Sequence, residues 1–354
     1  MDTPRKNADA SGAGRRFSRG EALELAGEAG LHDLCEAGLR ARLARFGHKA
    51  YYVYNQHLNF TNVCRNACRF CAFSKRAGEA GAYAMDLKTA RSKIESRLGE
   101  PIREIHIVGG LNPELPYDYY LDLVETAKTA RPDAVVKAFT AVEVAHLADT
   151  YGIGDKRVLS DLRSAGLGML PGGGAEVFAP ELRAILCPEK VTGARWLAVH
   201  ETAHELGIPT NATMLFGHIE NWEQRIDHLL ALRDLQDKTG GFNCFIPLPY
   251  QPGGNPLAAK GPDGVDLIRL MAVSRLALDN IPHLKAYWVY CGVKAAQMAL
   301  WAGADDFDGT LIEENIGHAA GADTPKGLTV AELKQYIAAA GFTPVERDTF
   351  FNEV

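Results

Sequence analysis

The chain has 354 residues and a formal net charge of −6, with 47% hydrophobic and 23% charged residues. This composition is that of a globular protein rather than a disordered one, and the negative charge argues against a protein that coats nucleic acid. No apolar run is long enough to span a bilayer, and no apolar segment follows the charged N-terminus. Neither a membrane span nor a secretory signal is therefore expected, and a cytoplasmic protein is predicted.

Residues 1–19 are expected to form a disordered tail, and residues 20–50 carry apolar side chains at the spacing of an N-terminal helical extension. From residue 51 to residue 312, short β-rich runs alternate with longer helical stretches, which is the pattern of βα units. Eight strands are expected: Asn55–Thr61, Glu104–Val108, Val135–Thr140, Gly168–Leu170, Thr210–Phe216, Asn243–Leu248, Leu284–Tyr290 and Asp305–Gly309.

Eight strands over this length predict a TIM-type (β/α)8 barrel. A six-stranded partial barrel with a trailing domain is the alternative, because the last two runs have the weakest strand pattern. A doubly wound sheet is disfavoured, since no strand–GxGxxG–helix unit opens the chain. Residues 313–354, a polar stretch followed by a short helix, are expected to form a C-terminal cap or lid.

The seven cysteines are unevenly placed. Cys35, Cys187, Cys244 and Cys291 are scattered among small or apolar neighbours and are expected to be buried. The other three, Cys64, Cys68 and Cys71, stand in a Cys-x3-Cys-x2-Cys pattern after the first expected strand of the barrel. A structural zinc site normally has four ligands, as does an electron-carrying iron–sulfur site. Three thiolates instead fit a [4Fe-4S] cluster with one open iron.

Further polar segments follow other strands, at the end of a barrel where catalytic residues lie. Gly109 and Gly110 allow close backbone approach, whereas a simple strand-ending turn is the alternative for them. Glu143 and His218 are candidates for contact with a substrate, and Asp306 and Asp308 occupy comparable loop positions. For His218, a histidine that is only hydrogen-bonded within its loop is the alternative, and the three carboxylates have a similar alternative.

Two further motifs have competing interpretations. The turn at residues 171–176 contains three successive glycines and ends in Glu176, a candidate for contact with ribose hydroxyls or, alternatively, an ordinary carboxylate at a helix N-terminus. The segment at residues 200–204 matches the zinc-protease string HExxH. Because it lies within an expected outer helix, two histidines packed against the sheet are the favoured interpretation.

The cysteine pattern, with Phe70 just before the last cysteine, resembles that of the radical S-adenosylmethionine (SAM) enzymes. Longer strings then resemble the aminofutalosine synthase family, which acts in the futalosine route to menaquinone. They are Thr61–Cys64, Cys68–Phe73, His106–Leu111, Lys137–Glu143, Pro171–Glu176, Gly240–Phe242 and Asp305–Thr310. The cyclic dehypoxanthine futalosine synthases and the deazaflavin synthase subunits share the cysteine loop and the glycine-rich turn.

This resemblance implies a radical SAM barrel with a [4Fe-4S] cluster on Cys64, Cys68 and Cys71, and SAM consumed as a co-substrate. By the same resemblance, Phe70, Gly109, Gly110 and Glu176 would hold SAM, and His218 and Glu143 would contact the substrate. The implied reaction adds a 5′-deoxyadenosyl radical to 3-[(1-carboxyvinyl)oxy]benzoate and yields 6-amino-6-deoxyfutalosine. A low-potential electron donor such as flavodoxin or ferredoxin is implied as well. The cyclase of the same route and a non-catalytic iron–sulfur or zinc protein are the alternatives.

Overall fold

The computed structural model describes residues 15–354. Its strands are β1 (Lys49–Val53), β2 (Asn55–Leu58), β3 (Glu104–Ile107), β4 (Val135–Ala138), β5 (Leu167–Met169), β6 (Thr210–Phe216), β7 (Phe242–Pro249), β8 (His283–Leu284), β9 (Asp306–Gly309) and β10 (Thr343–Arg347). Strands β2 to β5 pair in parallel in chain order, and so do β6 to β8.

Three isolated parallel bridges close these strands into a ring. Leu170 pairs with Thr210 between β5 and β6, and Lys285 pairs with Asp306 between β8 and β9. Ile312, just after β9, pairs with Gln56 of β2. The strands β2 to β9 therefore form a closed eight-stranded parallel barrel, as predicted, and the six-stranded alternative is wrong.

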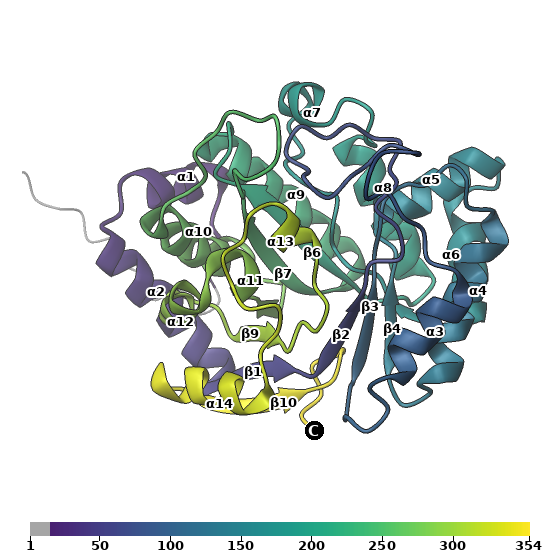
Figure 1. Cartoon of the computed structure of the whole chain (residues 1–354). Helices are drawn as coiled ribbons and strands as arrows, with labels where there is room; N and C mark the ends of the chain where they lie inside the picture. Colours follow the sequence, from purple (N-terminus) through teal and green to yellow (C-terminus); the bar gives the residue numbers. More distant parts are fainter. Residues whose placement is uncertain (1–14) are drawn as a thin grey trace, which may run out of the picture.

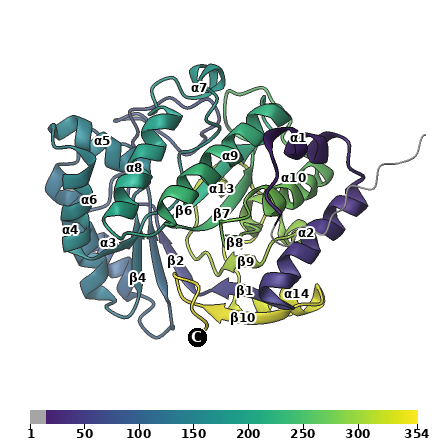
Figure 2. The ribbon, with the colours of Figure 1, turned by 180° about the vertical axis from the view of Figure 1, so that it is seen from behind.

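Helices surround this barrel (Figures 1 and 2). They are α1 (Arg19–Gly27), α2 (Leu31–Phe46), α3 (Leu87–Glu95), α4 (Tyr117–Ala130), α5 (Ala141–Tyr151), α6 (Asp155–Ala165), α7 (Pro180–Leu186), α8 (Gly193–Glu205), α9 (Trp222–Thr239), α10 (Gly264–Ala277), α11 (Trp288–Cys291), α12 (Val293–Trp301), α13 (Ile316–Ala319) and α14 (Val330–Ala339). Among residues 15–354, none of them has the length and apolar character needed to cross a bilayer.

The N-terminal region departs from the expected boundaries. The predicted tail lies mostly outside the described residues, which begin at residue 15, and α1 starts at Arg19 behind the capping box of Ser18 and Glu21. The helical extension ends at Phe46, and strand β1 begins at Lys49, before the expected limit of residue 50. β1 pairs with β9 on one side and with β10 on the other, so it extends the sheet below the barrel.

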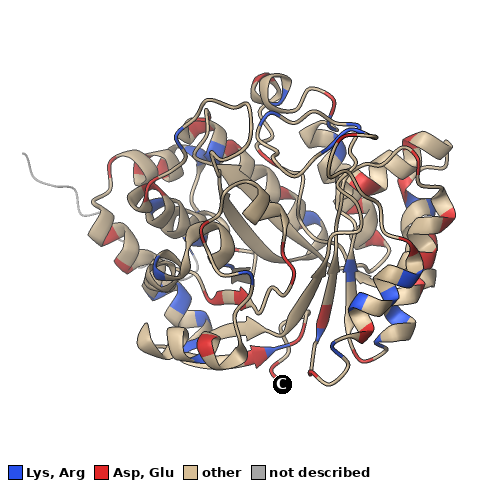
Figure 3. Ribbon diagram, in the orientation of Figure 1, with Lys and Arg blue, Asp and Glu red and all other residues tan. Residues whose placement is uncertain are grey.

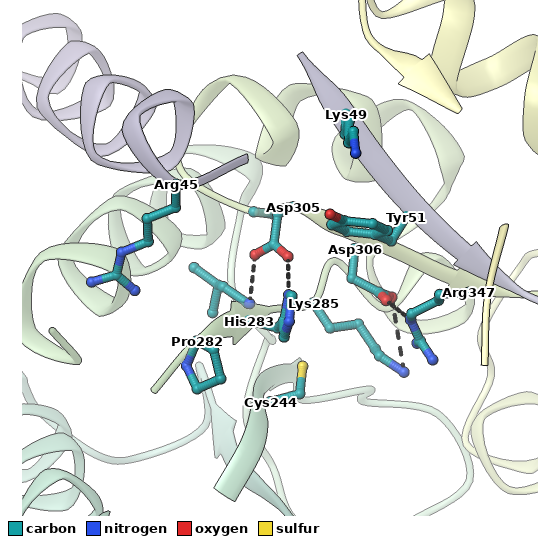
Figure 4. A network of polar contacts seen from close by, with 12 residues as sticks. Arg45, Lys49, Tyr51, Cys244, Pro282, His283, Lys285, Asp305, Asp306 and Arg347 are labelled. Atoms are coloured by element: carbon teal, nitrogen blue, oxygen red, sulfur yellow. Dashed lines mark hydrogen bonds and ion pairs between the residues drawn. The ribbon is translucent and has the colours of Figure 1, made fainter. Parts of the chain in front are cut away.

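The C-terminal segment is divided between the two ends of the barrel. Residues around α13 contribute Ile316 and Ala320 to the cavity at the carboxyl ends of the strands. By contrast, α14 and the unpredicted strand β10 lie at the other end, where β10 pairs with β1 (Figure 1). Arg347 of β10 forms a buried ion pair with Asp306 of β9 (Figure 4). Only the first part of the expected cap therefore lies over the mouth.

The seventh expected strand is much shorter than predicted. β8 contains only His283 and Leu284, and Trp288–Cys291 forms helix α11 instead. Trp288 is fully buried, and its indole N–H donates to the carbonyl of Gly309 at 2.9 Å. Tertiary packing of this aromatic run overrides its intrinsic preference for a strand.

Candidate active site

A cavity of about 310 Å³ opens among the loops that follow the barrel strands. Its wall includes the cysteine loop after β2, the glycine pair after β3 and the glycine-rich turn after β5. Polar side chains from the strands themselves form a deeper part of the wall. The cavity therefore lies at the carboxyl ends of the strands, where (β/α)8 enzymes bind their substrates.

All three cysteines of the predicted cluster motif line this cavity as free thiols. Their loop is held by backbone hydrogen bonds, among them Cys64 N–H to Lys75 O at 3.0 Å and Arg69 N–H to Leu186 O at 2.8 Å. Burial raises the pKa of the Cys68 thiol to about 12, and the nearby Lys190 ammonium opposes this shift. Within residues 15–354, no group of three or more Cys, His, Asp or Glu side chains has the geometry of a metal site. The roles of the three cysteines as cluster ligands therefore stay a prediction.

The backbone of the glycine pair after β3 packs directly against the cysteine loop and Phe60. A methyl group at Gly110 would lie 2.2 Å from the carbonyl oxygen of Val63, and one at Gly109 would lie 2.8 Å from the ring of Phe60. The following amide, Leu111 N–H, donates to the Sγ of Cys64 at 3.4 Å. Only glycine allows this close approach. Together with three soft thiol donors, the cradle is compatible with an iron–sulfur cluster and a small polar co-substrate.

Glu143 also lines the cavity, but its contacts are with the backbone. Its carboxylate accepts the N–H of Thr140 at 2.6 Å, which caps α5, and the N–H of Gly109 at 3.1 Å. Burial raises the pKa of Glu143 to about 7, and these N–H donors pull it in the opposite direction. The carboxylate therefore positions Gly109, while its predicted contact with the substrate stays a prediction.

The glycine-rich turn after β5 leads into a buried ion pair. Glu176 has a left-handed backbone with φ of 51°, which is uncommon for a residue with a side chain. Its carboxylate lies 2.6 Å from Lys190 Nζ, and that ammonium lies 5.2 Å from the centre of the Phe70 ring. All three side chains line the cavity. The Lys190–Glu176 ion pair and the ring of Phe70 therefore lie beside the other residues of the cysteine loop.

Several polar residues of the cavity wall were not predicted from the sequence. His57, His106 and Lys137 extend from β2, β3 and β4, and Lys285 follows β8. Lys285 lies 2.8 Å from Asp308 of the neighbouring strand β9, which the sequence had placed among the loop candidates. Strands that are buried on both faces normally consist of apolar residues. Charged and imidazole side chains at alternating positions of these strands were the available signal.

His218 does not reach the cavity, contrary to the predicted contact with substrate. Its side chain is fully buried, with Nδ1 2.8 Å from the carboxylate of Glu220 and Nε2 3.1 Å from the carbonyl of Leu215. Glu220 also accepts the backbone N–H of His218 and pairs with Arg225 at 2.7 Å. The turn after β6 therefore folds back on itself, and this histidine stabilises the turn.

The chain matches two family models in succession. Residues 58–232 match the model described as the radical SAM superfamily, and residues 239–353 match the CofH/MqnC C-terminal region. An aminodeoxyfutalosine synthase from Thermus thermophilus is 46% identical over 346 residues, which are 96% of this chain and 93% of that protein. The chain belongs to the radical SAM superfamily. The resemblance to its aminofutalosine synthase family is confirmed, as are the predicted enzymatic nature of the chain and its two cofactors, a [4Fe-4S] cluster and SAM.

Other relatives carry two different names. An aminodeoxyfutalosine synthase from Streptomyces coelicolor is 41% identical over 95% of this chain and 90% of its own length. A 5-amino-6-(D-ribitylamino)uracil–L-tyrosine 4-hydroxyphenyl transferase from Methanopyrus kandleri is 40% identical over 96% and 94%.

Solved structures share the radical SAM barrel at low sequence identity. Methylornithine synthase has a TM-score of 0.76 at 16% identity, and the match covers 94% of this chain and 95% of that one. The hydrogenase maturase HydG from Carboxydothermus hydrogenoformans has a TM-score of 0.73 at 16% identity, over 95% and 78%. At this identity the likeness supports the fold alone.

In this radical SAM barrel the HExxH string has a structural role. His200 Nδ1 and His204 Nε2 both lie 2.8 Å from the hydroxyl of Thr210, and His204 Nδ1 lies 2.6 Å from the hydroxyl of Thr239. Glu201 pairs with Lys238 instead of facing the histidines. The two histidines therefore join α8 to the outside of β6, as the favoured interpretation predicted.

Buried neutral histidines predict a loss of stability in mild acid. Burial lowers the pKa of His204 to about 4 and that of His228 to about 3, and it lowers the pKa of His200 as well. The unfolded chain, with histidine pKa values near 6.5, therefore takes up protons that the folded chain does not. The free energy of unfolding is therefore undiminished by these histidines above about pH 6.5, and it decreases as the pH falls below this value. We expect His228→Phe to reduce the difference in unfolding free energy between pH 7.5 and pH 5.5 by about 1.4 kcal/mol. Urea unfolding at both pH values measures it, and an unchanged difference would contradict the prediction.

Proposed function

We propose that this enzyme transfers the 5′-deoxyadenosyl group of SAM to 3-[(1-carboxyvinyl)oxy]benzoate in menaquinone biosynthesis. Radical addition to the enol-ether double bond, rearrangement and loss of the carboxyl carbon as carbon dioxide would give 6-amino-6-deoxyfutalosine, with methionine released from SAM and the electron returned to the cluster. The observation that carries the proposal is one cavity lined by the three cysteines, the glycine cradle and the buried Lys190–Glu176 pair. The similarity to aminodeoxyfutalosine synthases along nearly the whole chain supports it.

Different residues of the cavity would hold the cluster, SAM and the substrate. When bound on Cys64, Cys68 and Cys71, the cluster would supply the electron that cleaves SAM. Glu143 fixes the amide of Gly109, and the lack of side chains lets the glycine pair pack against Phe60 and Val63, which would hold its backbone beside the SAM site. Apolar residues from β7 line the other wall and exclude water from the reacting carbon atoms, and these are Ile246 and Leu248.

A product assay tests this function and its neighbours. Anaerobic protein with reconstituted cluster, SAM, reductant and 3-[(1-carboxyvinyl)oxy]benzoate is expected to form a product with the mass of 6-amino-6-deoxyfutalosine. Parallel reactions supply dehypoxanthine futalosine, or L-tyrosine with 5-amino-6-(D-ribitylamino)uracil. The second pair is included because relatives named as 4-hydroxyphenyl transferases are about 40% identical to this chain. Product in either parallel reaction, with none from the enol ether, would overturn the proposal.

The surface around the cysteine loop supports an acidic electron donor such as flavodoxin or ferredoxin. Arg65, Arg69, Lys75 and Arg76 lie within or just after the motif, and within residues 15–354 none of them forms an ion pair. The other 34 lysines and arginines of the chain are outnumbered by 44 acidic residues. Figure 3 shows basic residues on the loops above the barrel. The seven free cysteines also support a reducing, cytoplasmic location.

Reversing this charge is expected to slow reduction by flavodoxin. The Arg65→Glu/Arg69→Glu variant should lower kcat/KM for reduced flavodoxin by roughly tenfold at low salt, because complementary charge accelerates encounter. The difference should shrink at high salt, where charges are screened. Activity driven by dithionite should stay within about twofold of wild type, and Lys156→Glu/Lys334→Glu is the control with the same charge change. An equal loss with both reductants would contradict the prediction.

A further inference from the structure

Three adjacent strands present a row of polar side chains at one level inside the barrel. His57 of β2 is in register with His106 of β3, and His106 is in register with Lys137 of β4. All three side chains line the cavity. We call His57, His106 and Lys137 the polar row. Interior layers of such barrels are usually filled by branched apolar residues, so a row of this kind needs a ligand or another compensation.

The protein itself does not supply hydrogen-bond partners for all the polar atoms of this row. The imidazole rings of His57 and His106 stack with their centres 4.4 Å apart. His57 is 4% exposed, and its Nε2 has no hydrogen-bond partner among the described residues. A buried polar atom without a partner is destabilising. His200 Nε2 and His228 Nδ1 are unpartnered as well, but of these three histidines only His57 lines the cavity, where a bound group can complete its hydrogen bonding.

The chemistry of the row selects an anion. Burial lowers the pKa of both histidines, so each is a neutral ring with one N–H donor. Lys137 adds an ammonium that lies 2.6 Å from Glu104, one layer deeper in the barrel. Lys285, which follows β8, is already paired at 2.8 Å with Asp308 of β9, the other neighbour of β2 in the barrel. The row therefore offers the N–H donors of two neutral imidazole rings, beside the paired ammonium of Lys137, to an acidic group that enters from the mouth.

The position of the row distinguishes between the two carboxylates of the proposed substrate. His57 and His106 are the penultimate residues of their strands, directly below the loops that carry the cysteines and the glycine pair. The reacting double bond and the carboxylate attached to it must stay beside those loops, where SAM would bind. The ring carboxylate, meta to the ether oxygen, is the acidic group farther from the double bond and can extend past those loops toward the row. We infer that the polar row binds the ring carboxylate, an inference that rests on the proposed function.

Binding without turnover tests this assignment. The reconstituted holoenzyme with SAM, but without reductant, is titrated calorimetrically with 3-[(1-carboxyvinyl)oxy]benzoate and with 2-phenoxyacrylate, which lacks the ring carboxylate. Wild type should bind the dicarboxylate at least about tenfold more tightly, because hydrogen bonds to a charged group are the strong ones. His57→Phe keeps a ring that can stack on His106, and it should weaken binding of the dicarboxylate by about 10–100-fold. It should leave 2-phenoxyacrylate within about twofold of wild type.

The control is His228→Phe, a substitution of an equally buried histidine on α9 that does not line the cavity. It should leave both affinities unchanged. In His57→Phe the electron paramagnetic resonance signal of the reduced cluster should still change when SAM is added. An equal loss for both ligands, or loss of the SAM-dependent signal, would overturn the inference. If wild type forms no adenosylated product but the ligand selectivity follows this pattern, the proposed function fails and the carboxylate site stands.

Discussion

Replacing Cys68 with alanine should abolish the iron–sulfur cluster and reduce the formation of adenosylated product to the background of the assay. A cluster held by three cysteines loses a third of its protein ligands with one substitution. The loop itself should keep its path, because the backbone of the next residue, Arg69, bonds to Leu186 O at 2.8 Å and accepts from Leu257 N–H at 3.0 Å. Iron and sulfide per chain, measured after anaerobic reconstitution, report the loss directly.

Cys187 provides a matched control on the neighbouring segment. It is 1% exposed at the end of α7 and does not line the cavity. Cys187→Ala should retain full iron content and turnover, with only the modest loss of stability that follows deletion of a small buried group. Equal iron loss in both variants would mean that the defect is a general failure to fold. Full iron content in Cys68→Ala would remove Cys68 from the ligand set.

The barrel could be predicted because its strands carry their signal locally. The runs at β3, β4 and β6 are short, apolar or β-branched, and each is followed by a turn and a helical stretch. The cysteine loop and the glycine pair were recognisable for the same reason, since their spacing is written within a few residues. The prediction therefore succeeded where neighbours in the sequence are also neighbours in space.

Two of the features that were missed depend on distant partners, and the placement of His218 depends on how its own turn folds. β10 contains Pro344 and has little buried surface of its own, so only its pairing with β1, almost 300 residues earlier in the chain, makes it a strand. His218 has the position of a catalytic residue in the sequence, but Glu220 turns its ring away from the cavity. The polar row exists only because the register of three strands brings His57, His106 and Lys137 to one level. Such coincidences of register are not visible along one segment.

Removing Arg347 should destabilise the fold more than any surface substitution, although this residue lies far from the cavity mouth. Its side chain is 2% exposed and pairs with the fully buried Asp306 (Figure 4). The guanidinium also lies 4.0 Å from the centre of the Phe351 ring. Arg347→Leu leaves the carboxylate of Asp306 buried, with Lys285 3.9 Å away as the remaining cation. Breaking a buried pair from one side costs about 3–5 kcal/mol. The free energy of unfolding in urea measures this loss.

Two companion variants separate the charge effect from lost packing. Arg347→Leu/Asp306→Asn removes the stranded charge, so it should recover about 1–2 kcal/mol relative to Arg347→Leu. The control is the exposed ion pair between Lys49, on the adjacent strand β1, and Glu353, whose charged atoms are 2.5 Å apart. Lys49→Met should lower the free energy of unfolding by less than about 1 kcal/mol. If the double variant is no more stable than Arg347→Leu, the loss comes from packing of the guanidinium against Phe351. A recovery instead shows that this C-terminal strand, which pairs along its length with β1, also stabilises the barrel through its buried ion pair with β9.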